Sequence, residues 1–116
     1  MISMTAISTH VLDTATGRPA AGINVSLLRE AVAGVWQQLG TGVTDAEGRV
    51  QDLLAGETLD RGTYRLVYGT GEYHRGKGVP TFFPNVTVDF TVDDPGRHFH
   101  VPLLLSPYGY AAYRGS

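Results

Sequence analysis

Two of the four histidines stand one residue apart, at His98 and His100. In a β-strand such a pair points to one face, because successive side chains alternate between faces. An imidazole titrates near neutral pH, so it can take a proton from water or hold a metal ion. With His10, the pair could form a three-histidine zinc site with an open fourth position. The alternative is that each histidine is a surface or hydrogen-bonded structural residue, the commoner role of a single histidine.

The segment that carries the pair, His98 to Leu105, has the pattern of a strand. One of its faces is apolar throughout and fits a hydrophobic core: Phe99, Val101, Leu103 and Leu105. The other face combines two imidazoles with two apolar side chains: His98, His100, Pro102 and Leu104. A solvated face normally carries charges or hydroxyls. We therefore expect this second face to be covered, most simply by another subunit.

A first strand, Ile7 to Asp13, shows the same division between its two faces. The side chains predicted to face the core are Ile7, Thr9 and Val11, which leaves Ser8, His10 and Leu12 on the opposite face. Three of the four histidines are thus expected on non-core faces of two strands. The fourth, His74, lies in a Gly-rich stretch expected to be a loop.

The rest of the chain also alternates at period two more often than at helical spacing, and turn residues separate the segments. Six further strands are predicted: Asn24 to Arg29, Trp36 to Val43, Arg49 to Leu53, Thr63 to Tyr68, Val86 to Val92 and Tyr108 to Tyr113. Turns are predicted at Thr16 to Pro19 and Asp45 to Gly48. Eight short strands predict one antiparallel β-sandwich domain over residues 1–116.

Composition excludes several classes of function. The 116 residues contain 9 Lys and Arg against 11 Asp and Glu, a net charge of −2, so binding to nucleic acid or to anionic lipid is not expected. There is no cysteine, which excludes thiolate catalysis and disulfides. No apolar run approaches the length of a membrane helix, and Met1 to Thr9 do not resemble a secretory signal. We expect a cytoplasmic protein.

Three motifs in the same order resemble those of the 5-hydroxyisourate hydrolases, the transthyretin-like proteins of purine breakdown. They are STHVLDT at residues 8–14, leading to GRPA at 17–20; HFHVPLLLSP at 98–107, leading to YGY; and YRGS at 113–116. The last tetrapeptide separates the hydrolases of this family from transthyretin, the hormone carrier. The resemblance extends over nearly the whole chain.

The resemblance implies a prealbumin-like sandwich of two four-stranded sheets, with a short helix after the fifth strand, near Gly71 to Lys77. Helical structure there is at odds with the glycines of Gly69 to Gly78. Family members are homotetramers, dimers of dimers, with active sites in a channel between the dimers. This implication agrees with the covered face expected above.

The resemblance also implies the reaction, in which water opens the six-membered ring of 5-hydroxyisourate. The product is 2-oxo-4-hydroxy-4-carboxy-5-ureidoimidazoline, on the way from urate to allantoin. The implied catalytic residues are His10, Arg49 and His100, and Tyr113 and Ser116 join them in binding the substrate. A neutral imidazole can accept a proton from water, and the guanidinium can stabilise an oxyanion. The reaction needs no metal or other cofactor.

The resemblance further implies that the C-terminal segment docks beside the two imidazoles. Gly115 would let the backbone approach closely, and Ser116 would add hydrogen-bond acceptors. Two other classes of function remain open from the sequence: a transthyretin-like module that holds an aromatic ligand without turnover, and a zinc-dependent hydrolase using the three histidines.

Overall fold

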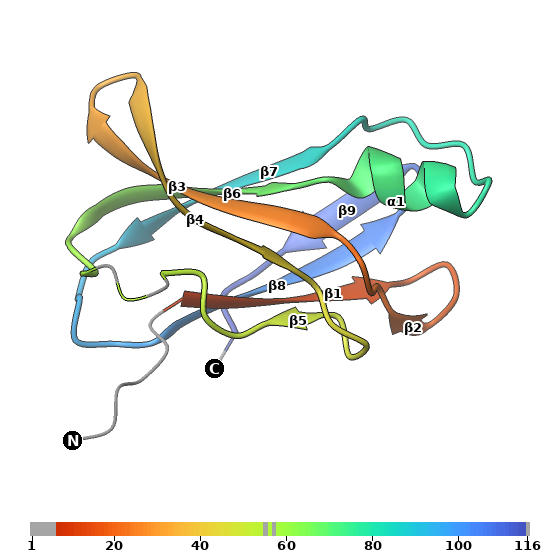
Figure 1. Cartoon of the computed structure of the whole chain (residues 1–116), viewed down its shortest axis with the longest axis horizontal. Helices are drawn as coiled ribbons and strands as arrows, with labels where there is room; N and C mark the ends of the chain where they lie inside the picture. Colours follow the sequence, from red (N-terminus) through yellow and green to blue (C-terminus); the bar gives the residue numbers. More distant parts are fainter. Residues whose placement is uncertain (1–6, 55, 57, 116) are drawn as a thin grey trace.

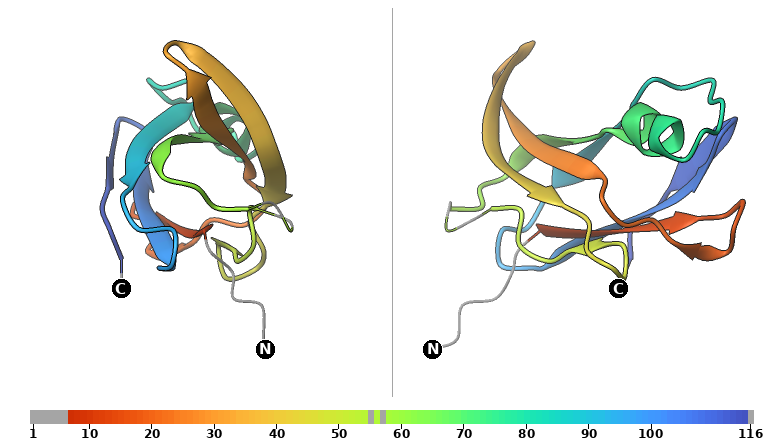
Figure 2. Two further views of the ribbon diagram at one scale, coloured as in Figure 1. Left: turned by 90° about the vertical axis from the view of Figure 1, so that its left-hand side faces the viewer. Right: turned by 45° about the vertical axis from the view of Figure 1, so that its right-hand side comes forward.

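The computed structural model describes residues 7–54, 56 and 58–115, which form two β-sheets packed face to face (Figures 1 and 2). The first sheet has the order β2 (Arg18–Pro19), β1 (Ile7–Asp13), β8 (Phe99–Ser106), β9 (Gly109–Ala112), and β5 (Arg49–Val50) also pairs with β1. The second has the order β4 (Val35–Val43), β3 (Asn24–Val32), β6 (Gly62–Tyr68), β7 (Val86–Val92). The all-β sandwich is confirmed, although two-residue strands give the first sheet five strands instead of four.

The hydrophobic core fills the space between the sheets. The face of β8 predicted to be apolar is buried there, with Phe99, Val101, Leu103 and Leu105 at most 6% exposed. Tyr64, Leu66 and Tyr68 of β6 approach it from the second sheet and are fully buried. Burying this apolar surface is the main force that holds the two sheets together.

The pairing of β1 with β8 is parallel, so the prediction of a wholly antiparallel sandwich is wrong at this pair. After β2 the chain forms β3 and β4 of the second sheet and returns to the first sheet for β5. It then adds β6 and β7 to the second sheet before β8, so a long connection separates the parallel neighbours β1 and β8. In the resulting register Ser8 pairs with His100, and His10 pairs with Pro102. The non-core faces of the two histidine-bearing strands therefore lie side by side.

Several strand boundaries differ from prediction. The strand expected at Arg49 to Leu53 ends at Val50. Val50 and Leu53 are both buried although they are three positions apart, so the segment does not keep the alternation of a strand. Arg18–Pro19, predicted as part of a turn, pairs with the end of β1. Strands β3 and β4 run further than expected and meet at a tight hairpin, where Gly34 has φ +79°.

The helix that the family resemblance implied is present as α1, Thr70–Gly76. It follows β6 and lies at one end of the sandwich (Figure 1). Gly71 suits this position because a Cβ there would clash with the carbonyl oxygen of Pro84. His74, expected in a loop, lies in the helix and is buried. Within the described ranges, no helix has the length and apolar character that crossing a bilayer requires.

Candidate active site

The predicted catalytic side chains come together on the non-core face of the first sheet. His10 pairs with Arg49 of β5 on one side and with Pro102 of β8 on the other. One row along, Ser8 pairs with His100. Directly paired residues point to the same face of a sheet, and positions two apart share that face. His10, Arg49 and His100, separate in the sequence, therefore occupy adjacent rows of one surface.

Ser8 connects His100, which lies in β8, with His98, which immediately precedes β8. Its hydroxyl lies 2.8 Å from His100 Nδ1 and 2.9 Å from His98 Nε2. Ser8 is buried, whereas His98 is exposed and His100 is half-buried. Strand alternation placed Ser8 on the same face as His10, but nothing in that pattern indicated that it would bridge two imidazoles.

The C-terminal segment returns along β8 to the same place. Tyr113 N donates to Pro102 O at 3.3 Å, and Gly115 N donates to His100 O at 2.8 Å. The close approach needs a glycine, since a Cβ on residue 115 would lie 2.6 Å from His100 Cδ2. The Tyr113 ring is 55% exposed, so backbone bonds rather than ring burial hold this segment. Ser116 lies outside the described residues.

Arg49 is positioned by the turn that precedes β5. The Asp45 carboxylate accepts hydrogen bonds from Arg49 N at 3.0 Å and from Glu47 N at 2.9 Å. These bonds lower the pKa of Asp45, and the nearby positive charges of Arg49 and His10 lower it further. A carboxylate that stays ionised therefore fixes the backbone from which the guanidinium projects.

The surroundings of His100 favour the neutral form of its imidazole. Burial is the main cause that lowers its pKa, and the nearby positive charges of His98, His10 and Arg49 lower it further. A neutral imidazole has one ring nitrogen with a lone pair, which is the form that a general base requires.

A cavity of about 200 Å³ opens at these residues, lined by Ser8, Thr9, Arg49, Gln51, His98 and His100. Gln51 was not predicted as a site residue. It follows β5 two positions after Arg49, so sequence alternation from Arg49 could have indicated it. The amide of Gln51 adds a donor and an acceptor to a site that otherwise offers imidazoles, a hydroxyl and a guanidinium.

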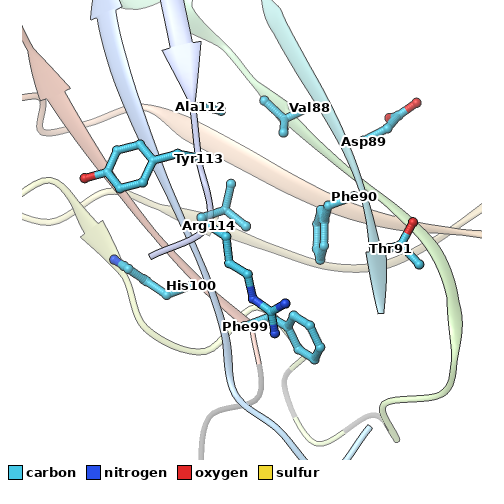
Figure 3. Close-up of a pocket in the computed structure, with 10 residues that line it drawn as sticks. Val88, Asp89, Phe90, Thr91, Phe99, His100, Ala112, Tyr113 and Arg114 are labelled. Atoms are coloured by element: carbon cyan, nitrogen blue, oxygen red, sulfur yellow. The ribbon is translucent and has the colours of Figure 1, made fainter. Parts of the chain in front are cut away.

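A second cavity, of about 310 Å³, lies between the edges of the two sheets and is lined by residues of β7, β8 and the C-terminal segment (Figure 3). In Figure 3 the side chains of His100 and Tyr113 lie on one side of the strands, whereas Arg114 extends toward Phe99 on the other. The Arg114 guanidinium carbon is 4.9 Å from the centre of the Phe99 ring. His100 and Tyr113 thus share one surface, although both contribute to the lining of this second cavity.

The side chains of the three histidines do not form the ligand set of the zinc hypothesis. In the part of the chain that the structure describes, no three His, Asp or Glu side chains are grouped to hold a metal ion. Ser8 bonds to nitrogens of both His98 and His100. The three-histidine site that the spacing suggested does not form among these residues.

Comparison with known proteins gives one consistent family. The model of the HIUase/Transthyretin family matches residues 7–115. A 5-hydroxyisourate hydrolase of Salmonella dublin is 46% identical over 110 residues, covering 95% of this chain and 80% of the relative. The structure of Klebsiella pneumoniae 5-hydroxyisourate hydrolase has a TM-score of 0.84 at 38% identity, covering 97% of this chain and 100% of that one. Sea bream transthyretin in complex with thyroxine has a TM-score of 0.88 at 30% identity, covering 94% and 93%.

Proposed function

The chain belongs to the HIUase/transthyretin family, and from this premise we propose that it is an enzyme that hydrolyses 5-hydroxyisourate. Water opens the six-membered ring to give 2-oxo-4-hydroxy-4-carboxy-5-ureidoimidazoline, a step in the degradation of urate to allantoin. The observation that carries the proposal is the convergence of His10, Arg49 and His100 on one surface. A protein that only holds an aromatic ligand needs no such set of acid–base groups.

The reaction begins with removal of a proton from water. The neutral imidazole of His100 accepts this proton while the water oxygen bonds to a ring carbonyl carbon of the substrate. The carbonyl oxygen then carries negative charge in a tetrahedral intermediate. When the carbon–nitrogen bond breaks, the ring nitrogen takes a proton and the former carbonyl carbon becomes a carboxyl group. His10 is the partner imidazole, placed to orient the substrate or protonate the departing nitrogen.

Arg49 stabilises the negative charge that develops on the substrate. A guanidinium remains charged at all relevant pH values and presents several N–H donors in one plane. That arrangement matches the carbonyl and ring edge of a planar substrate, and donors placed before the reaction lower its barrier. Tyr113 and Ser116 complete the proposed substrate-binding set.

The active assembly proposed is a homotetramer, a dimer of dimers, working in the cytoplasm. The non-core face of β1 and β8 supports this assembly, because Leu12 and Leu104 lie beside the imidazoles and remain half-buried in the single chain. A second subunit over this face would bury those leucines and remove water from the cavity.

The decisive experiment generates 5-hydroxyisourate from urate in situ and follows its ultraviolet decay with and without the protein. Accelerated decay proportional to protein concentration is expected, and prolonged chelator treatment should leave the rate unchanged. Decay at the spontaneous rate, together with binding of thyroxine, would instead identify a transthyretin-like binding module. Loss of activity on chelation, restored by zinc, would favour the metal-dependent alternative.

A further inference from the structure

The hydroxyl of Ser8 lies within hydrogen-bond distance of two imidazole nitrogens at once, His100 Nδ1 and His98 Nε2. A hydroxyl has one hydrogen, so it donates to one of these nitrogens and accepts from the other. The three groups therefore have two complementary arrangements. In one, His100 carries its hydrogen on Nδ1, and in the other, His100 carries it on Nε2.

These arrangements differ in the chemistry open to His100. With the hydrogen on Nδ1, the lone pair is on Nε2, the ring nitrogen that points away from Ser8. With the hydrogen on Nε2, the lone pair is bonded to the Ser8 hydroxyl and cannot accept a proton from water. Only the first arrangement makes His100 a general base for a reaction in the adjacent cavity.

We propose that Ser8 is a positioning residue that holds His100 in the Nδ1–H tautomer, with His98 accepting the hydrogen of the Ser8 hydroxyl. The inference rests on the proposed function of His100 as the base. As Nε2 gains a proton from water, the Nδ1–H group becomes a cationic donor and its bond to Ser8 strengthens. Ser8 thus stabilises the protonated base without touching the substrate.

This stabilisation matters because the other groups around His100 oppose its charge. Burial removes part of the hydration of His100, and the positive charges of Arg49 and of protonated His10 oppose a positive charge on its ring. The Ser8 oxygen is a neutral acceptor on the covered side of the ring. Removing it should make the imidazolium harder to form and should let the Nε2–H tautomer compete.

The test compares the wild-type protein with Ser8→Ala and Ser8→Thr. In Ser8→Ala, kcat should fall about 10- to 100-fold, the range for one bond to a charged group, with little change in KM. The acid limb of the pH–rate profile should move to lower pH. Ser8→Thr keeps the hydroxyl, so its kcat and the position of its acid limb should match those of the wild type. Ser106→Ala is the matched control, since it removes a serine hydroxyl bonded to Gly109 O at 2.9 Å in the turn after β8.

Nitrogen-15 NMR of the wild-type imidazoles provides a readout that does not depend on turnover. His100 should show a protonated Nδ1 and an unprotonated Nε2, and Ser8→Ala should shift the population toward Nε2–H. A wild-type Nε2–H tautomer, or an unchanged pH profile and kcat in Ser8→Ala, would overturn the proposal. If 5-hydroxyisourate is not a substrate but the tautomer is as expected, the proposed function fails and the positioning by Ser8 stands.

Discussion

His10 and Arg49 are directly opposite each other in the antiparallel pairing of β1 with β5. The pairing brings an imidazole and a guanidinium together on one face of the sheet, beside the row that contains His100. The residues come from distant parts of the chain, so their proximity depends on this short two-residue strand. The turn carboxylate of Asp45 holds the strand in place.

Replacing Arg49 by Lys tests whether the guanidinium has a role that charge alone cannot supply. An ammonium keeps the charge but loses the planar pair of donors, so kcat/KM should fall about 10- to 100-fold. The rate of substrate decay measures the effect. Arg61→Lys is a suitable control, because Arg61 is exposed and donates to Asp93 O far from the site. Full activity in Arg49→Lys would reduce Arg49 to a residue that balances charge.

The two site histidines should each be essential for turnover. His10→Ala and His100→Ala should each lower kcat by about 10²- to 10⁴-fold, the usual contribution of general acid–base catalysis. Both side chains lie on the non-core face, so circular dichroism and gel filtration should match the wild type. A variant with near-normal turnover would show that its histidine has no catalytic role.

The pH dependence of kcat/KM should reflect the depressed pKa of His100. The proposed base, His100, is active when neutral, and burial lowers its pKa below 6.5. The acid limb should therefore lie below pH 6.5, with activity retained as the pH falls through that value and lost only at lower pH. Initial rates between pH 5 and 8, with substrate prepared immediately beforehand, measure the limb. A limb above pH 6.5 would contradict the assigned base.

The contact between Gly115 and His100 can be tested by adding a single methyl group. In Gly115→Ala the new Cβ would lie 2.6 Å from His100 Cδ2 and 3.1 Å from Pro102 Cγ, so the imidazole or the segment must move. Turnover should fall, while the free energy of unfolding changes by only about 0.5 kcal/mol because the core is untouched. Gly109→Ala is the control, since the nearest atom to its Cβ would be 3.8 Å away. Equal turnover in the two variants would show that the C-terminal segment does not position His100.

The hydrogen bond between Tyr73 and Asp13 should stabilise the fold rather than the site. Tyr73 Oη donates to Asp13 Oδ2 at 2.7 Å and joins α1 to the end of β1. Burial, and then the bond to Asp13 and its charge, raise the pKa of Tyr73, so it remains a donor at neutral pH. Tyr73→Phe leaves a carboxylate oxygen of a residue only 3% exposed without this donor and should cost about 1–3 kcal/mol in urea unfolding.

Tyr108→Phe is the control for that measurement, because the Tyr108 ring is 70% exposed and its loss of a hydroxyl should have little effect. Both variants should be unfolded at one protein concentration, since assembly contributes to apparent stability. Identical unfolding midpoints for Tyr73→Phe and the wild type would show that the bond contributes nothing.

Much of the fold could be predicted from local sequence pattern. Alternation along β8 correctly assigned Phe99 and Leu103 to the core and His100 to the opposite face. The helix was a different case, since the glycines around Gly71 argued against it and only the family resemblance implied it. The reason for a glycine at residue 71 is a tertiary contact: the helix passes so close to Pro84 that a side chain there does not fit.

By itself the sequence determined which residues share a face of each strand, because alternation is a property of the extended backbone. Its motifs also indicated the family and the candidate residues His10, Arg49 and His100. Only the tertiary structure decided the register, since shifting a strand by two residues leaves every side chain on its original face. Packing of the two sheets selects the parallel register in which Ser8 meets His100, and that long-range choice creates the bridge between the imidazoles.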